Sequence, residues 1–92
     1  MTGKERAGWR AKAAVLEPII QIGKDGISPE TVKNIDDALK ARELIKINVQ
    51  KNCFEDLHEL ANTAAERTRS DVIQVIGRRF VLYRKAPDKK AR

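Results

Sequence analysis

The sequence has little of the chemistry from which disulfides, metal sites or nucleophilic active sites are built. Its 92 residues include one cysteine, Cys53, and one histidine, His58. A lone cysteine cannot close a disulfide within the chain, which favours a reducing compartment. His58 has no partner at metal-ligand spacing and Cys53 has no nearby histidine to activate it, so we expect a surface histidine and a packing cysteine. No two acids resemble a general acid–base pair, and we predict no enzyme, no metal and no cofactor.

Long apolar runs are also missing. No segment approaches the roughly 20 apolar residues that cross a bilayer, so we expect no membrane partner. The basic residues near the start are not followed by the apolar stretch of a secretory signal. Glu5 and the direct run into a structured segment argue against an organellar presequence. These absences predict a cytoplasmic protein.

Positive charge, in contrast, is abundant. Lys and Arg number 19 against 13 Asp and Glu, a net charge of +6, and the sequence pI is near 9.8. Such a surface attracts polyanions by long-range steering and counterion release, so nucleic acid, acidic membrane and acidic protein are the candidate partners. A domain of this length buries about 60–65% of its unfolded surface. That leaves little room for a deep cleft and predicts no small-molecule substrate.

The spacing of apolar residues alternates between helical and extended along the whole chain. Pro18 ends the first helical stretch, because the residue before a proline disfavours the helical region. Ser28 and Pro29 are typical of an N-cap and first turn, and Gly77-Arg78 suits a two-residue hairpin. The expected elements are helices at 4–16, 29–42 and 54–68, and strands at 19–22, 44–50, 72–76 and 80–84.

This α-β-α-β-α-β-β order predicts an α/β fold with a mixed four-stranded sheet packed by helices. Strands joined through helices should run parallel, and the final hairpin should be antiparallel. We assign residues 1–85 to a single domain and the basic segment 86–92 to a disordered tail. A monomer is the default oligomeric state.

The segment Gly23-Lys24-Asp25-Gly26 lies between the first strand and the capped second helix. Its two glycines allow a tight turn and a close approach of the backbone to a ligand. Free amides at the start of the helix suit a phosphate, and Lys24 adds a point charge at the tip of the loop. The alternative is an ordinary strand-to-helix turn with a solvated lysine, which the tetrapeptide alone does not exclude.

Other side chains are able to extend such a site. The basic candidates are Arg10, Lys12, Arg78, Arg79 and Arg84. Solubilising charge is the interpretation for Lys40, Lys46 and Lys51. Trp9 and Tyr83 could stack on bases, although packing is the commoner role of such residues.

Three stretches together resemble the CRM-domain or YhbY-like family of RNA-binding proteins over about residues 6–85. They are Arg10 through Ala13 with Leu16 and Pro18 leading into Ile22-Gly23-Lys24-Asp25-Gly26, then Glu43-Leu44-Ile45-Lys46, and finally Gln74-Val75-Ile76-Gly77 with Val81-Leu82-Tyr83-Arg84. The resemblance implies a fold like the C-terminal domain of translation initiation factor three. It also implies a GxxG loop that clamps nucleic-acid backbone as in KH domains.

By position, residues 23–26 match the family's loop, Arg10 matches a basic position in its first helix, and Arg84 matches the basic end of its last strand. Stand-alone bacterial members are associated with precursors of the large ribosomal subunit, and plant multi-domain relatives assist intron splicing in organelles. A lone chain of 92 residues is similar to the bacterial kind. The sequence departs from the family's usual Leu, His and Lys at Trp9, Ala14 and Glu17, and Glu17 is expected to remove positive charge near the loop.

The leading hypothesis is a protein that binds 23S-type ribosomal RNA in large (50S) subunit precursors and assists their assembly. Two alternatives stay open. One is a protein-interaction module that docks acidic assembly partners, and the other is an RNA chaperone or splicing-type factor acting on a non-ribosomal RNA. DNA binding is disfavoured, because the sequence has no helix-turn-helix spacing.

Overall fold

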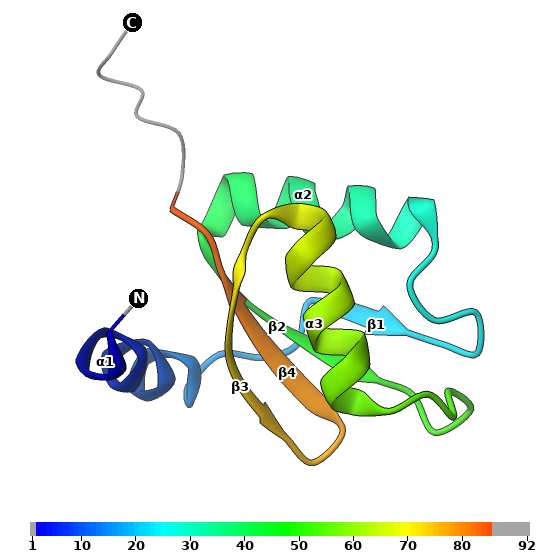
Figure 1. The fold of residues 1–92 in the computed structure, drawn as a ribbon, viewed down its shortest axis with the longest axis horizontal. Helices are drawn as coiled ribbons and strands as arrows, with labels where there is room; N and C mark the ends of the chain where they lie inside the picture. The colour runs from blue at the N-terminus through cyan, green and yellow to red at the C-terminus, as the bar shows by residue number, and fades with distance from the viewer. Residues whose placement is uncertain (1, 86–92) are drawn as a thin grey trace, which may run out of the picture.

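A computed structural model describes residues 2–85, so the predicted tail at 86–92 lies outside the described residues. Helices and strands follow the predicted order (Figure 1). The helices are α1 (Gly3–Ala13), α2 (Pro29–Arg42) and α3 (Leu57–Thr68), and the strands are β1 (Ile20–Ile22), β2 (Leu44–Val49), β3 (Asp71–Ile76) and β4 (Arg79–Tyr83). Within residues 2–85, no helix has the length and apolar character needed to cross a membrane.

The strands form one mixed sheet in the order β1-β2-β4-β3. β1 and β2, joined through α2, pair in parallel, whereas β4 pairs antiparallel with both β2 and β3. β3 therefore runs in the same direction as β2, but β4 lies between them. Gly77 has a φ of 59° while Arg78 does not have a positive φ, which fits a type II′ hairpin turn. The predicted class, mixed sheet and antiparallel hairpin are confirmed.

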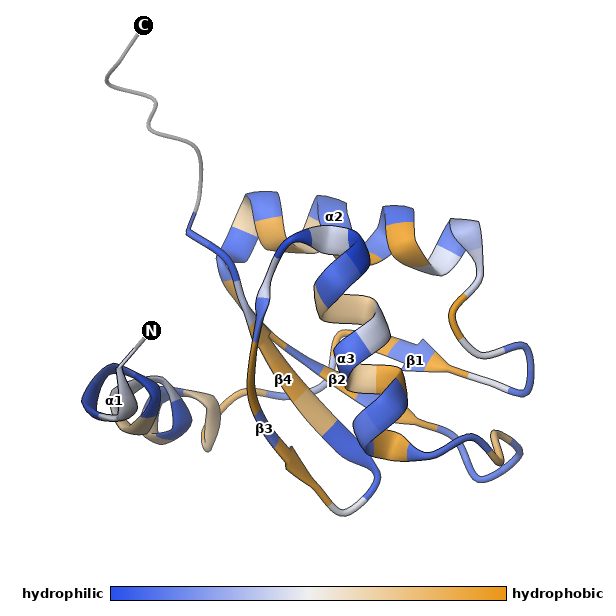
Figure 2. Ribbon diagram, in the orientation of Figure 1, coloured by the Kyte–Doolittle hydropathy of each residue, from blue (hydrophilic) through white to orange (hydrophobic). Residues whose placement is uncertain are grey.

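The two faces of the sheet are covered unequally. α2 and α3 pack on one face over the main core, whose larger members are Ile22, Ile35, Leu39, Ile45, Ile47, Leu60, Phe80 and Leu82. On the other face α1 builds a smaller core, in which Ala13, Ile73 and Val81 are buried and Trp9, Leu16, Leu44 and Tyr83 pack around them. Figure 1 shows α1 standing apart from α2 and α3. Figure 2 shows strands that are largely hydrophobic and helices in which hydrophilic and hydrophobic residues alternate.

A bulge allows β3 to serve both cores. Val72 lies opposite Leu82 and Gln74 lies opposite Val81, so the register shifts and Ile73 is left without a partner. The extra residue puts Val72 and Val75 on the main core although they are three positions apart, while Ile73 is buried in the α1 core.

The first helix ends earlier than predicted, at Ala13 rather than at residue 16. The Leu16 N–H donates to the Ala13 carbonyl at 3.0 Å, and this turn brings the Leu16 side chain onto the α1 core. The chain then runs extended through Pro18 into β1. Packing of Leu16 therefore ends the helix before the proline could do so.

The third helix begins later than predicted, at Leu57 rather than at residue 54. Asp56 is its N-cap, because the carboxylate accepts the Glu59 N–H at 3.0 Å. Phe54 and Glu55 therefore belong to a loop. The second helix begins where predicted, behind the Ser28 N-cap.

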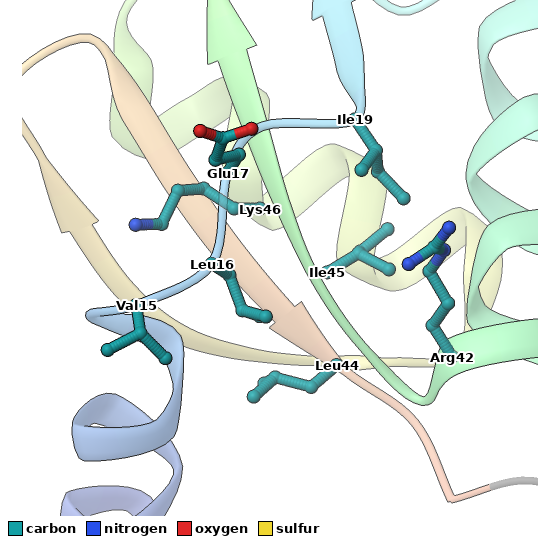
Figure 3. Close-up of a pocket in the computed structure, with 8 residues that line it drawn as sticks. All are labelled: Val15, Leu16, Glu17, Ile19, Arg42, Leu44, Ile45 and Lys46. Atoms are coloured by element: carbon teal, nitrogen blue, oxygen red, sulfur yellow. The ribbon is translucent and has the colours of Figure 1, made fainter.

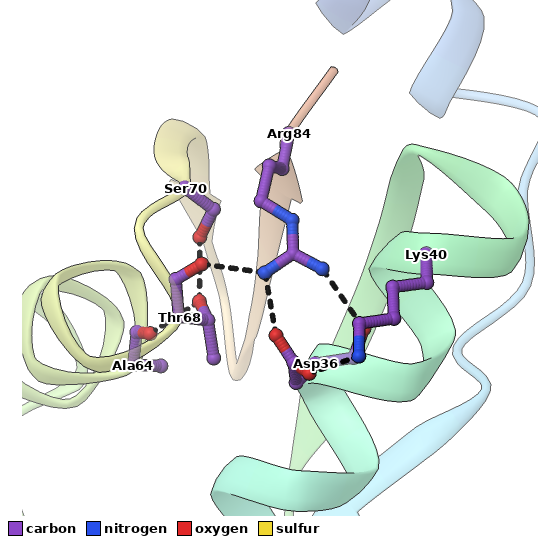
Figure 4. A network of polar contacts seen from close by, with 6 residues as sticks. All are labelled: Asp36, Lys40, Ala64, Thr68, Ser70 and Arg84. Carbon is purple, nitrogen blue, oxygen red and sulfur yellow. Dashed lines mark hydrogen bonds and ion pairs between the residues drawn. The ribbon is translucent and has the colours of Figure 1, made fainter. Parts of the chain in front are cut away.

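The side chain of Arg84, which follows β4, joins α2 to the end of α3 (Figure 4). Its guanidinium donates to Asp36 Oδ1 at 2.6 Å, to the Asp36 carbonyl at 3.1 Å and to the Thr68 carbonyl at 2.7 Å. The side chain is only 18% exposed, and the Asp36 side chain is 34% exposed. Hydrogen bonding from Arg84 holds the pKa of Asp36 below its ordinary value, with a smaller contribution from Lys40. The ion pair with Asp36 and the hydrogen bond to Thr68 thus connect the end of β4 to α2 and to the end of α3.

We expect Arg84→Ala to lower the free energy of unfolding by about 1.5–3 kcal/mol, because it leaves a half-buried carboxylate and two carbonyls without their charged donor. Lys40→Ala removes the exposed partner of Asp36, at 3.2 Å, and should cost less than about 0.5 kcal/mol. Denaturant unfolding of both variants measures the difference. Equal costs would contradict the role given to Arg84.

The cost of Arg84→Ala should also depend on pH. Folding lowers the pKa of Asp36, so the ion pair stabilises the protein fully above the unfolded pKa of about 3.9 and loses its effect as pH falls through the folded pKa. The gap between wild type and variant should therefore narrow in acid. A gap that stayed constant from neutral pH into acid would contradict the charge-based account.

Candidate nucleic-acid interface

The predicted loop is a closed turn between β1 and α2. The Gly26 N–H donates to the Gly23 carbonyl at 3.0 Å, and Lys24 and Asp25 are exposed at the tip. Gly26 has a φ of 64°, a left-handed conformation that costs other residues roughly 1–2 kcal/mol. Two residues later Ser28 caps α2. The turn is therefore held directly before the positive end of a helix dipole.

A second loop, residues 50–56, lies against this turn. A Cβ at Gly23 would come 3.1 Å from Gln50 Oε1, and a Cβ at Gly26 would collide with the Glu55 carboxylate. Figure 1 shows the two loops side by side at the opposite end of the long axis from α1. Because the second loop leads into α3, the N-termini of α2 and α3 both lie at this end.

These adjoining loops carry charges of both signs. The exposed charged residues are Lys24, Asp25, Lys51, Glu55 and Asp56. Because carboxylates repel phosphate, these loops do not attract an anion through an excess of positive charge. Attraction of a phosphate here depends on Lys24, the backbone N–H groups and the helix N-termini.

Arg78 braces the second loop from the hairpin. Its guanidinium donates to the carbonyls of Val49 at 3.1 Å, Gln50 at 2.5 Å and Cys53 at 3.0 Å. Its own carbonyl accepts the Val49 N–H at 2.7 Å. Arg78 and Arg84 were both predicted to contact RNA. In the structure both guanidinium groups donate to partners inside the fold, and Arg78 is also exposed.

Arg79 has a different setting, on the part of the sheet that α1 leaves uncovered. We call this surface the open face, defined by Gln21, Lys46, Asn48, Ile76 and Arg79. Strand pairing places them together, since Asn48 lies opposite both Gln21 and Arg79 and Ile76 lies opposite Arg79. Arg79 Nε donates to Asn48 Oδ1 at a long 3.4 Å, and both side chains line two shallow hollows on this face. The open face presents basic, amide and apolar groups to solvent.

Sequence reasoning assigned Lys46 to solubilising charge. Alternation along β2 separates Lys46 and Asn48 from the buried Ile45 and Ile47. The pairing with β4 sets Asn48 opposite Arg79, and Lys46 lines the same hollow of the open face as Arg79. The alternation was visible in the sequence, but the pairing of β2 with β4 was not.

α1 carries the other predicted basic residues, Arg10 and Lys12, at the far end of the long axis from the Gly23–Gly26 turn (Figure 1). The rings of Trp9 and Tyr83 stack on each other with centroids 4.1 Å apart, and Lys12 Nζ lies 4.7 Å from the Trp9 ring centroid. Burial raises the pKa of Tyr83. The structure therefore gives these aromatic residues the packing role, and it does not gather all the predicted basic residues into one compact site.

Glu17 is not near the loop, contrary to expectation. It precedes β1, whereas the Gly23–Gly26 turn follows that strand. Figure 3 shows Glu17 and Lys46 on one side of a hollow of about 270 Å³ where the chain crosses β2, with Arg42 on the other side. Glu17 also lines one hollow of the open face together with Arg79, so its negative charge lies on that side of the sheet.

Cys53 is buried and His58 is exposed, as predicted. Among residues 2–85, no three His, Cys, Asp or Glu side chains gather in a way that could hold a metal ion.

Comparison with known proteins identifies the family of this chain. The CRS1 / YhbY (CRM) domain matches residues 1–84. The chain belongs to this family. It is 42% identical over 90 residues to "Probable RNA-binding protein YqeI" of Bacillus subtilis, covering 98% of this chain and 94% of that protein. It is 40% identical over 86 residues to "Probable RNA-binding protein MJ0652" of Methanocaldococcus jannaschii, covering 91% of this chain and 63% of that protein.

A solved structure agrees with the CRM assignment. The solution structure of the hypothetical protein SAV1595 from Staphylococcus aureus superposes with a TM-score of 0.83 at 47% sequence identity, covering 99% of this chain and 95% of that one. The CRM fold described above is therefore shared over almost the whole length of both chains.

We expect Gly26→Ala to lower the free energy of unfolding in two ways. The left-handed backbone costs about 1–2 kcal/mol, and displacement of Glu55 by the new methyl group adds a second cost. Adding Glu55→Ala should recover only the second part. Gly23→Ala is the matched control, since it meets only a flexible glutamine end at 3.1 Å and should stay within about 0.5 kcal/mol. Thermal melting of the four variants, including Glu55→Ala alone, checks this, and an unaltered Gly26→Ala protein would contradict the turn geometry.

Proposed function

We propose that this CRM-domain protein is a monomer that binds structured ribosomal RNA in the cytoplasm, through the Gly23–Gly26 turn and the basic side chains of the open face and α1. The observation that carries the proposal is the closed turn itself, with Lys24 exposed directly before the capped start of α2. Lys24 offers a phosphate a point charge, and the start of α2 offers it the positive end of a helix dipole. The names of the CRM relatives as RNA-binding proteins point the same way.

The open face supplies the second part of the interface. Lys46 and Arg79 stand there beside amide side chains, and α1 adds Arg10 and Lys12. Basic groups spread from the open face to α1 favour phosphate contacts along a folded RNA over recognition of one short base sequence. Arg78 and Arg84 already donate to partners within the fold, so we do not count them among the proposed phosphate contacts.

The large-subunit precursor as target, with 23S-type RNA as its component, comes from the resemblance to stand-alone bacterial members of the family. The charge balance supports an RNA target of this kind, because a net charge of +6 suits a densely anionic partner. We propose that the protein assists assembly by holding a local RNA shape.

We expect Lys24→Glu and Arg79→Glu each to weaken binding of a structured ribosomal RNA fragment by about fivefold or more, since each replaces a phosphate contact with repulsion. The slope of log affinity against log salt should become shallower by about 0.7–0.9 for each lost contact. Filter binding across a salt series measures both quantities.

Arg67→Glu is the matched control, because it makes the same charge change on the last turn of α3, in the helical layer on the opposite side of the sheet from the open face. It should shift affinity much less than the two site variants. Equal losses from all three would mean that net charge, and not a site, governs binding.

In a cell lysate sedimented through sucrose at low salt, the protein should migrate with large-subunit precursors and be released at high salt. Nuclease treatment should also release it, whereas a complex bridged by protein should survive nuclease. Migration with free proteins even at low salt would contradict the ribosomal target.

A further inference from the structure

Phe54 is the most exposed of the large apolar side chains in residues 2–85, at 94%. The other aromatic rings described are packed, since Phe80 is fully buried and Trp9 and Tyr83 stack on each other. Single exposed apolar residues are ordinary on protein surfaces. The position of Phe54 therefore matters more than its exposure.

The loop that presents Phe54 is held on both sides. Before it, the buried Cys53 donates its N–H to the Gln50 carbonyl at 3.1 Å, and Arg78 donates to the carbonyls of both residues. After it, Asp56 caps α3. A ring on a loop braced in this way loses little conformational entropy when a ligand packs on it.

Phe54 also precedes the residue that contacts the Gly23–Gly26 turn. Its neighbour Glu55 places a carboxylate against Gly26, so the ring is one residue from the contact between the two loops. In RNA, one ribose links each phosphate to its base, so a phosphate at Lys24 brings a base close to the second loop. Glu55 and Asp56 disfavour a second phosphate beside the ring, which leaves its apolar face to a base.

We propose that Phe54 stacks on an unpaired base of the RNA whose backbone lies at the Gly23–Gly26 turn. The inference rests on the proposed RNA-binding function and adds a preference to it. Bases within a duplex are already stacked on both faces, whereas those of loops and bulges are free to stack on an aromatic ring. The site therefore selects RNA in which an unpaired nucleotide follows the clamped phosphate.

The test compares two RNA probes, a stem-loop with unpaired bases and a continuous blunt duplex. Phe54→Ala and Phe54→Leu should weaken stem-loop binding by about fivefold to a hundredfold, because both remove the aromatic face. Duplex binding should hardly change. Phe54→Trp should retain stem-loop binding, and its indole fluorescence should be quenched by the stem-loop, with wild-type Trp9 as the background signal.

Val15→Ala is the matched control, since Val15 is also an exposed apolar residue, at 85%, but follows α1. It should leave affinity for both probes unchanged. Thermal melting of each variant establishes that it is folded, which the exposure of Phe54 leads us to expect.

If Lys24→Glu loses stem-loop affinity while Phe54→Ala keeps it, stacking is overturned and the backbone clamp stands. Equal losses on stem-loop and duplex, or retention by Phe54→Leu, would likewise overturn stacking on a base. Absence of binding by the wild type to either RNA would overturn the clamp and the stacking together.

Discussion

Burial of β4 on both faces is the constraint on which the rest of the molecule depends. Phe80, Val81 and Leu82 follow one another and are all fully buried, with Phe80 and Leu82 in the main core and Val81 in the α1 core. A strand that is apolar on both sides needs a neighbour at each edge and a cover on each face. β2 and β3 supply the edges, α2 and α3 one cover, and α1 the other.

The cover supplied by α1 is shorter than the sheet, and this has a functional consequence. The α1 core needs shielding only where Ala13 meets Ile73 and Val81. Beyond that point β1, β2 and the hairpin turn polar side chains outward, with Lys46 and Arg79 among them. The short second core that covers β4 therefore leaves the open face uncovered, and this is the surface through which we propose that RNA binds.

Three arginines near the end of the chain show how partners decide the role of one residue type. Arg84 is held by Asp36 and the Thr68 carbonyl, and Arg78 is held by carbonyls of the second loop. Arg79 makes one long contact, to Asn48, and stays exposed. Hydrogen bonds within the fold therefore engage the first two guanidinium groups more fully than the third. None of this can be read from the run of basic residues in the sequence.

The site at the opposite end is built from two loops that are distant in sequence. The Gly23–Gly26 turn was predictable, because glycine spacing and a capped helix start are local signals. Its contact with Glu55 was not, since that residue fits a helical pattern until Asp56 is seen to cap α3. The exposure of Phe54 was not predicted for the same reason, since this residue was also assigned to the helix.

By itself the sequence determined the order and class of the elements, the cap of α2, the hairpin turn, and the resemblance that membership of the CRM family bears out. These depend on short-range periodicity and turn chemistry, which act within a few residues. Only the tertiary structure decided which cations are free, which aromatic ring is exposed, and that β4 lies between β2 and β3. Those outcomes depend on contacts between residues far apart in the chain, where packing and hydrogen-bond partners compete.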